Sequence, residues 1–244
     1  MNKEEQILDE LEKELSLIDD NLVNWNVNYF RFHRSRYLSD LKIFLKYYKE
    51  GEVLEIGSAP CHFSFCLAKL NYPFCGLDVD PERLSSFIQK NGLNIKKCNI
   101  EKEPIPFEDN TFHFIFFNEV FEHMRIDPIS TLKEIRRVLH PDGVLMLSTP
   151  NLYSLHNILK FMLGRGFDNP YKEFNKIHEL GHMGHVREYS AKQVAEFLEN
   201  TGYSLQEANF KSYRKYKGIK IPFNLVRFLF PNVNTHQVTI SRKK

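Results

Sequence analysis

The chain has 244 residues, a formal net charge of +2 and a hydrophobic fraction of 42%. These values suit one globular α/β domain with an appendage, and the small net charge identifies no partner by itself. The sequence contains no Cys-x-x-Cys pair, which argues against a disulfide framework. Because the start is acidic and no apolar run approaches the ~20 residues that span a bilayer, we expect a cytoplasmic protein without a signal peptide.

The first fifty residues predict two amphipathic helices. Residues 3–22 repeat apolar side chains at alternating steps of three and four, which is typical of a helix with one buried face. Residues 28–49 repeat the pattern, and Gly51 follows as a helix end. We therefore expect an N-terminal helical extension over residues 1–50, followed by the main domain over 51–244.

Short apolar runs alternate with helical patterns in the main domain. The runs predict strands over residues 53–56, 74–77, 95–99, 112–117, 144–148, 205–210 and 237–240. We expect Asp80 to cap and Pro81 to open the helix after the second strand. Pro141 and Gly143 predict a turn before the fifth strand. The alternation predicts a Rossmann-like α/β sheet with helices on both faces.

Residues 151–189 interrupt this alternation. They contain Asn, Gly, His and aromatic residues around one short helical pattern near 155–163. An insertion of this length after a core strand is typical of a lid or substrate loop. The sequence Ser190-Ala-Lys-Gln193 then forms a capping box, which predicts the start of another helix.

The stretch from Val53 to Ser64 predicts a strand, a tight turn and a helix start, an arrangement that directs backbone N–H groups toward a ligand. A dinucleotide fingerprint needs three glycines, whereas this turn has Gly57 followed by Ala59 and Pro60. Glu55 just before the turn would repel a pyrophosphate and attract a cation such as an amino group. Asp78, some twenty residues later, can accept hydrogen bonds from a ribose diol. A ligand with a ribose at one end and an amino acid at the other is S-adenosylmethionine (SAM).

Five motifs then occur in order along the chain. They are Glu-Ile-Gly at 55–57, Gly-Leu-Asp at 76–78, Ile-Pro-Phe-Glu-Asp-Asn-Thr-Phe at 105–112, Asn-Glu-Val-Phe-Glu-His at 118–123 and Leu-His-Pro-Asp-Gly at 139–143. Together they resemble the class I SAM-dependent methyltransferases, a resemblance that implies a seven-stranded sheet with an antiparallel final strand. Carried over by position, the cofactor contacts fall at Glu55, Gly57, Ser58, Ala59, Asp78, Val79, Asn99, Ile100 and Asn118.

Two glutamates and a histidine follow the fourth predicted strand, in the order Glu119-Val-Phe-Glu122-His123. The spacing of three predicts both carboxylates on one side of a helical turn, with His123 adjacent. This block resembles a metal-using subset of the family, the small-RNA 2′-O-methyltransferases and the ubiquinone-biosynthesis O-methyltransferases. The resemblance implies Glu119, Glu122, His123 and His185 as Mg²⁺ ligands, with His123 and His185 as the catalytic residues. The alternative is that these residues shape the pocket or cap a helix without a metal.

Two further patterns have open interpretations. His178-Glu-Leu-Gly-His182 matches the zincin motif, but glycines and the lack of a helical apolar stripe favour a polar lid loop, in which either histidine helps to bind substrate or metal. Residues 211–231 mix basic and apolar side chains. This mixture predicts a solvated face, contact with a membrane surface, or binding of a polyanion such as nucleic acid.

The sequence therefore predicts methyl transfer from SAM to a hydroxyl oxygen of a small metabolite, lipid or glycan, with Mg²⁺ assistance. N- or C-methylation of a small metabolite is the alternative within the same class. Outside that class, Ala59 and Cys61 leave open a non-catalytic SAM-binding domain, because glycines are common in the family at these positions. The basic C-terminal segment leaves open a nucleic-acid-binding module.

Overall fold

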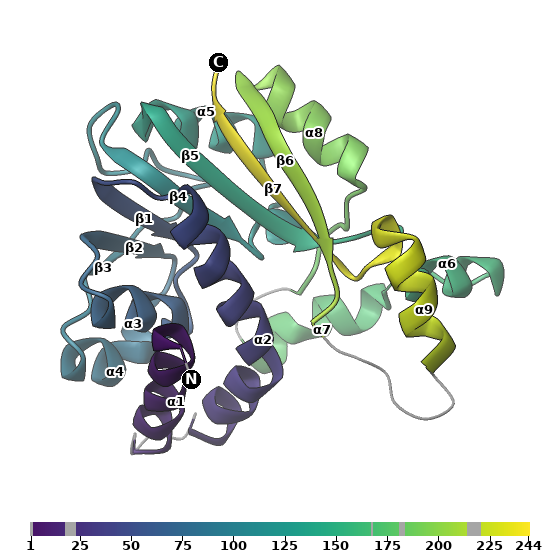
Figure 1. The fold of residues 1–244 in the computed structure, drawn as a ribbon, viewed down its shortest axis with the longest axis horizontal. Coiled ribbons are helices and arrows are strands. Elements are labelled where there is room, and N and C mark those ends of the chain that lie inside the picture. The colour runs from purple at the N-terminus through teal and green to yellow at the C-terminus, as the bar shows by residue number, and fades with distance from the viewer. Residues whose placement is uncertain (1, 18–22, 167, 181–183, 214–220) are drawn as a thin grey trace. The chain divides into compact units, whose positions relative to one another are not determined.

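The computed structural model describes residues 2–17, 23–166, 168–180, 184–213 and 221–244. Its strands form a seven-stranded sheet in the order β3-β2-β1-β4-β5-β7-β6 (Figure 1). The strands are β1 (Glu52–Ile56), β2 (Phe74–Asp78), β3 (Ile95–Lys97), β4 (Phe112–Asn118), β5 (Leu139–Pro150), β6 (Tyr203–Lys211) and β7 (His236–Lys243). β1 pairs in parallel with β2 and β4, whereas β6 and β7 pair antiparallel. The predicted α/β Rossmann-like fold with an antiparallel final strand is confirmed.

Helices connect most of these strands. The α-helices are α1 (Lys3–Ser16), α2 (Val23–Tyr47), α3 (His62–Lys69), α4 (Ser85–Lys90), α5 (Pro128–Val138), α6 (Leu155–Met162), α7 (Pro170–Leu180), α8 (Ala191–Asn200) and α9 (Ile221–Leu229). Short 3-10 helices are η1 (Pro81–Leu84), η2 (Phe121–His123) and η4 (Pro231–Val233). The predicted N-terminal helices are therefore present, although the end of the first predicted helix, beyond residue 17, lies outside the described residues.

The chain divides into two compact units. The N-terminal unit comprises Met1–Phe116 and Val138–Val144, and the C-terminal unit comprises Phe117–Arg137 and Leu145–Lys244. The N-terminal helices share a unit with β1, β2 and β3, so the domain boundary at residue 50 remains a prediction.

Aromatic packing fixes α2 within the N-terminal unit. The ring of Phe44 lies 5.0 Å from that of Phe114 and 5.4 Å from that of Phe116, centroid to centroid, and all three side chains are fully buried. Burying a side chain of this size contributes about 1.5–3 kcal/mol. The strand β4 therefore carries aromatic side chains that hold the helical extension, in addition to its backbone pairing.

In the C-terminal unit, α8 begins where the capping box predicts. Ser190 Oγ accepts a hydrogen bond from the Gln193 N–H at 3.3 Å, and Gln193 Oε1 accepts one from the Ser190 N–H at 2.9 Å. The helix buries Val194 and Leu198. Its start is thus set by local chemistry and its orientation by an apolar stripe.

Three local predictions are wrong, the first only in part. Asp80 lies at the N-cap and Pro81 opens the helix as predicted, but the Asp80 side chain makes no capping hydrogen bond and the helix is a 3-10 helix. β3 ends at Lys97, and the Asn99 N–H instead donates to the Glu103 carboxylate. β5 begins at Leu139, so the predicted turn lies inside the strand. A Cβ on Gly143 would lie 3.0 Å from the Phe112 carbonyl oxygen, which shows how closely the backbones approach there.

The insertion contains more helix than its sequence pattern predicts. The short helix near 155–163 is confirmed as α6. The prediction of an irregular loop around His178 is wrong, because this residue lies near the end of α7, where it is exposed. His182, the second histidine of the zincin pattern, lies outside the described residues.

Candidate active site

The predicted cofactor turn lies in the N-terminal unit between β1 and α3. Gly57 has φ +76°, a left-handed conformation that side chains other than glycine adopt only with strain. The N–H groups of Gly57 and Ser58 both donate to the Leu77 carbonyl, at 2.8 and 3.0 Å. These bonds fasten the turn to the carboxyl end of β2, where a nucleoside-binding acid is predicted.

Asp78 is that acid, and it is buried at the end of β2. Its Oδ2 accepts a hydrogen bond from the Ala59 N–H at 2.9 Å, and its Oδ1 accepts the Asp80 N–H at 3.0 Å. A carboxylate has about four acceptor positions, so capacity remains for two ribose hydroxyls. The structure thus brings together the turn and the acid that the sequence predicts.

Glu55 is buried behind the turn and accepts a hydrogen bond from Ser64 Oγ. Burial raises the pKa of its carboxyl to about 8, with the nearby Asp78 charge adding to the effect and the Ser64 bond opposing it. A carboxyl with this pKa is mostly neutral at pH 7. Glu55 therefore carries less negative charge than the sequence argument for cation binding assumes.

The other predicted cofactor contacts lie beyond β2, β3 and β4. Val79 is exposed next to Asp78, and Asn99 Oδ1 accepts the Glu101 N–H at 3.2 Å. Asn118 ends β4, and its Oδ1 is buried without a hydrogen-bond partner among the described residues. An unbonded buried acceptor is costly unless a ligand or water donates to it. The roles of these residues and of Ile100 remain predictions.

Glu119 begins the acidic cluster in the C-terminal unit, and its φ of +57° places it in the left-handed region. Such a conformation costs a non-glycine residue about 1 kcal/mol or more and is frequent at functional sites. Oε1 of Glu119 accepts Ser148 Oγ at 2.9 Å, and its Oε2 lies 3.5 Å from Nε2 of His236. The predicted helical turn is absent here, so the carboxylate faces Ser148 and His236.

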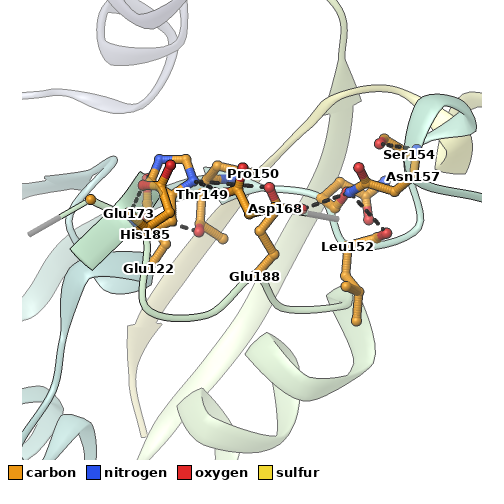
Figure 2. A network of polar contacts seen from close by, with 12 residues as sticks. Glu122, Thr149, Pro150, Leu152, Ser154, Asn157, Asp168, Glu173, His185 and Glu188 are labelled. Carbon is orange, nitrogen blue, oxygen red and sulfur yellow. Dashed lines mark hydrogen bonds and ion pairs between the residues drawn. The ribbon is translucent and has the colours of Figure 1, made fainter. Parts of the chain in front are cut away.

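Glu122, His123 and His185 each direct a potential ligand atom to one place, with all three atoms within 4.8 Å of one another. The Glu122 carboxylate is buried, and its Oε2 accepts Thr149 Oγ1 at 2.9 Å (Figure 2). Its Oε1 lies 4.0 Å from Nε2 of both His123 and His185. The structure thus brings together three of the four predicted metal ligands, and Glu119 falls outside this group.

The backbone fixes the tautomer of His123. Nδ1 of His123 lies 3.0 Å from the carbonyl oxygen of Gly184. Because a carbonyl only accepts hydrogen bonds, Nδ1 carries a proton, and in the neutral imidazole Nε2 then keeps its lone pair. The nitrogen that faces Glu122 is therefore the one able to bind a cation or accept a proton.

His185 has acids on its other side. Its Nδ1 lies 3.7 Å from Asp168 Oδ2 and 3.9 Å from Glu188 Oε1 (Figure 2). Burial lowers the pKa of His185 from its ordinary value of 6.5, and the Asp168 charge opposes that change. His185 is therefore neutral at pH 7, as a ligand or base must be.

Sequence reasoning missed two acids beside His185. Asp168 and Glu188 form a second potential metal-binding group with this histidine. Burial raises the pKa of Glu188 to about 7, and Asn157 Nδ2 donates to it at 2.7 Å. The spacing of three between His185 and Glu188 was an available signal, whereas nothing in the sequence pattern marks Asp168.

A family model described as "Methyltransferase domain" matches residues 29–208, which is most of the chain. The chain belongs to the SAM-dependent methyltransferases.

Curated relatives are about a quarter identical to this methyltransferase over the aligned residues. A Mycolicibacterium smegmatis protein named "Probable S-adenosylmethionine-dependent methyltransferase" is 26% identical over 157 residues, which cover 64% of this chain and 53% of that protein. A Campylobacter fetus protein named "tRNA U34 carboxymethyltransferase" is 24% identical over 244 residues, covering 92% of this chain and 83% of that protein. The methyltransferase thus spans about half the length of the Mycolicibacterium relative.

Solved structures support the fold of the methyltransferase. The PH0226 protein from Pyrococcus horikoshii superposes with a TM-score of 0.61 at 18% identity, covering 87% of this chain and 91% of that one. A Thermotoga maritima SAM-dependent methyltransferase, described as a possible histamine N-methyltransferase, gives 0.60 at 21% identity, covering 91% and 97%. Identities this low support the fold alone.

Backbone contacts hold the His185 loop of the methyltransferase in place. The N–H groups of Val186 and Arg187 donate to the Glu122 carbonyl at 2.8 and 3.2 Å. The His185 N–H donates to Glu173 Oε2 at 3.0 Å, and a Cβ on Gly184 would lie 1.7 Å from that same oxygen. Gly184 therefore leaves room for the Glu173 carboxylate, which holds the backbone of His185.

Proposed function

We propose that this methyltransferase moves a methyl group from SAM to a hydroxyl oxygen of its acceptor, and that Glu122, His123 and His185 activate the hydroxyl. One observation carries the proposal: two imidazole Nε2 atoms each lie 4.0 Å from the same buried carboxylate oxygen. Such a set suits an oxygen nucleophile that must lose its proton as it reacts.

The residues of the cofactor turn fit SAM. Asp78 would hold the ribose, since its carboxylate is fixed by two backbone N–H groups and keeps acceptor capacity. Gly57, Ser58 and Ala59 would lie near the methionine part, and Asn99 with Ile100 would flank the adenine. When bound, SAM supplies an activated methyl group on its sulfonium sulfur. The chain holds the donor in place, which lowers the entropic part of the barrier.

The acceptor cluster fits a divalent cation as well. One carboxylate and two imidazoles are ordinary ligands for such ions, and the Gly184 carbonyl orients His123 as outer contacts orient metal-bound histidines. When bound, a divalent cation lowers the pKa of a hydroxyl and orients it. In the alternative arrangement, neutral His185 accepts the proton of the hydroxyl directly, and Asp168 beside Nδ1 stabilises the resulting cation.

An RNA acceptor is the second candidate. Two relatives are named tRNA U34 carboxymethyltransferase, and residues 211–231 of this chain carry six lysines and arginines and no acid. RNA hydroxyls belong to the same chemical class as the hydroxyls of glycans. The two acceptor classes differ in their dependence on salt, because RNA binding releases counterions.

Glu122→Gln tests the proposal most directly. Methyl transfer from isotopically labelled SAM would be measured on catechols, glycans, lipid-linked sugars and short RNAs, with Mg²⁺ or with a chelator. We expect the variant to lose about 100-fold or more in turnover, as for a typical acid–base group, while its SAM affinity by calorimetry is unchanged.

Glu134→Gln is the matched control, since Glu134 pairs with Arg137 on the surface of α5. Full turnover in Glu122→Gln would overturn the role of the cluster. Chelator-resistant turnover with a large Glu122→Gln effect would favour the histidine base over the cation. Methyl transfer only to nitrogen or carbon acceptors would replace the hydroxyl proposal.

A further inference from the structure

Three helices of the C-terminal unit expose their large apolar side chains and bury a polar one. The buried polar residues are Asn157 in α6, Glu173 in α7 and Arg227 in α9. The exposed ones include Met162 (78%), Leu163 (73%), Tyr171 (79%), Phe174, Leu225, Phe228 (80%), Leu229 and Phe230. A helix on a protein surface normally has the opposite arrangement, with its apolar face toward the core.

Polar contacts fix this inverted orientation. Asn157 Nδ2 donates to the Leu152 carbonyl at 3.2 Å and to Glu188 at 2.7 Å (Figure 2). Glu173 accepts from Lys176 Nζ at 2.6 Å and from the His185 N–H. α6 and α7 are thus held on their polar sides, so turning the apolar side of either helix inward would leave buried polar groups without partners.

The segments around α6 and α9 are bonded to each other. Asn151, just before α6, donates through Nδ2 to the carbonyls of Asn232 and Asn234, both at 2.8 Å. Asn232 lies in the short 3-10 helix η4, which follows α9, and Asn234 comes just after η4. The exposed side chains of the two helices therefore lie on segments that are joined in the C-terminal unit. Large apolar surfaces on soluble proteins mark binding sites for proteins or membranes.

The charge of the adjoining sequence favours a membrane. Residues 211–231 carry six basic residues and no acid. Anionic lipid headgroups attract such a segment, and the aromatic rings of Tyr171, Phe174 and Phe228 suit the boundary between headgroups and acyl chains. No helix among the described residues is long and apolar enough to cross a membrane.

We propose that α6, α7 and α9 form a docking surface that rests on an anionic lipid bilayer. The exposed side chains would enter the headgroup region without crossing it. This inference does not depend on the proposed acceptor chemistry, because binding to lipid is measured without turnover.

The test is sedimentation of the whole chain with vesicles of phosphatidylcholine, with and without phosphatidylglycerol. We expect binding to the anionic vesicles, weakened about tenfold or more without phosphatidylglycerol or at high salt. The double variants Met162→Ser/Leu163→Ser and Phe228→Ser/Leu229→Ser should each reduce binding about tenfold or more, since each removes two large apolar groups. These residues are exposed, so the urea midpoint should stay unchanged.

Leu17→Ser is the matched control, because Leu17 is 68% exposed but lies in the N-terminal unit. It should bind vesicles like the unaltered chain. Absent binding to anionic vesicles, or equal loss in the control, would overturn the proposal. A dimer in sedimentation equilibrium that Phe228→Ser dissociates would assign the surface to a second copy instead.

Discussion

Glu55 couples the stability of the fold to pH. Its folded pKa is about 8, against an ordinary value of 4.5, so the folded chain holds this proton more tightly than the unfolded chain. The contribution of this proton to the free energy of unfolding is present in full below pH 4.5. It is lost as the pH rises toward about 8, and the free energy of unfolding falls by at most ~1.4 kcal/mol per pH unit. We expect Glu55→Gln to lose less stability than the unaltered chain between pH 5 and 9, measured by urea unfolding.

Ser64→Ala provides a control of opposite sign. Ser64 donates to the Glu55 carboxylate and so favours its charged form. Its removal should raise the pKa of Glu55 and extend the loss of stability to higher pH. Parallel pH dependence in all three chains would show that Glu55 does not carry the effect.

Residues of the candidate site were predictable only where a local motif marks them. Glu122 and His123 follow β4 within a recognisable block, and His185 was singled out from the later histidines by the resemblance to the metal-using subset of the family. Asp168 and His236 contact these residues or Glu119 from remote positions, with no spacing to identify them. The charge state of Glu55 was also unpredictable, because it depends on burial that only the folded chain has.

At the scale of one element, the α8 capping box supplies a measurable share of stability. Ser190→Ala removes the side-chain oxygen that accepts the Gln193 N–H. We expect the free energy of unfolding to fall by about 1 kcal/mol, the usual value of a serine N-cap. Urea unfolding measures this loss in Ser190→Ala. Ser86→Ala, which changes an exposed serine within α4, is the control. An equal effect in both variants would contradict the role of the cap.

Elements with buried apolar faces were predicted well, and α7 shows the limit of that approach. Each predicted strand corresponds to an observed one because apolar side chains in strands such as β4 face the core. Periodicity analysis assumes that apolar residues are inside. In α7, Tyr171 and Phe174 lie three residues apart and are exposed, whereas Glu173 is buried, so periodicity assigns the buried side of this helix wrongly.

For the whole molecule, ligand binding should appear as added stability. A ligand that binds only the folded chain adds about 2.7 kcal/mol at 100 times its dissociation constant. We expect SAM to raise the melting temperature of the unaltered chain and of Glu122→Gln equally. Asp78→Asn should show a smaller rise at the same SAM concentration, because it weakens the acceptor for the ribose. Thermal unfolding monitored by calorimetry measures all three.

An equal rise in the melting temperature of Asp78→Asn would contradict the ribose role of Asp78.

The overall fold was predictable because strand and helix patterns agree along most of the chain and match five ordered motifs. The acceptor was not, because we expect its selection to depend on 151–189 and 211–231, where packing rules say little.

Glu122 performs two tasks with different atoms. Its carboxylate faces the two histidines, while its main-chain carbonyl holds the N–H groups of Val186 and Arg187. A change of side chain at this position removes the first task and leaves the second in place. Variation at position 122 would therefore alter the chemistry of the candidate site while the loop that carries His185 keeps the same attachment.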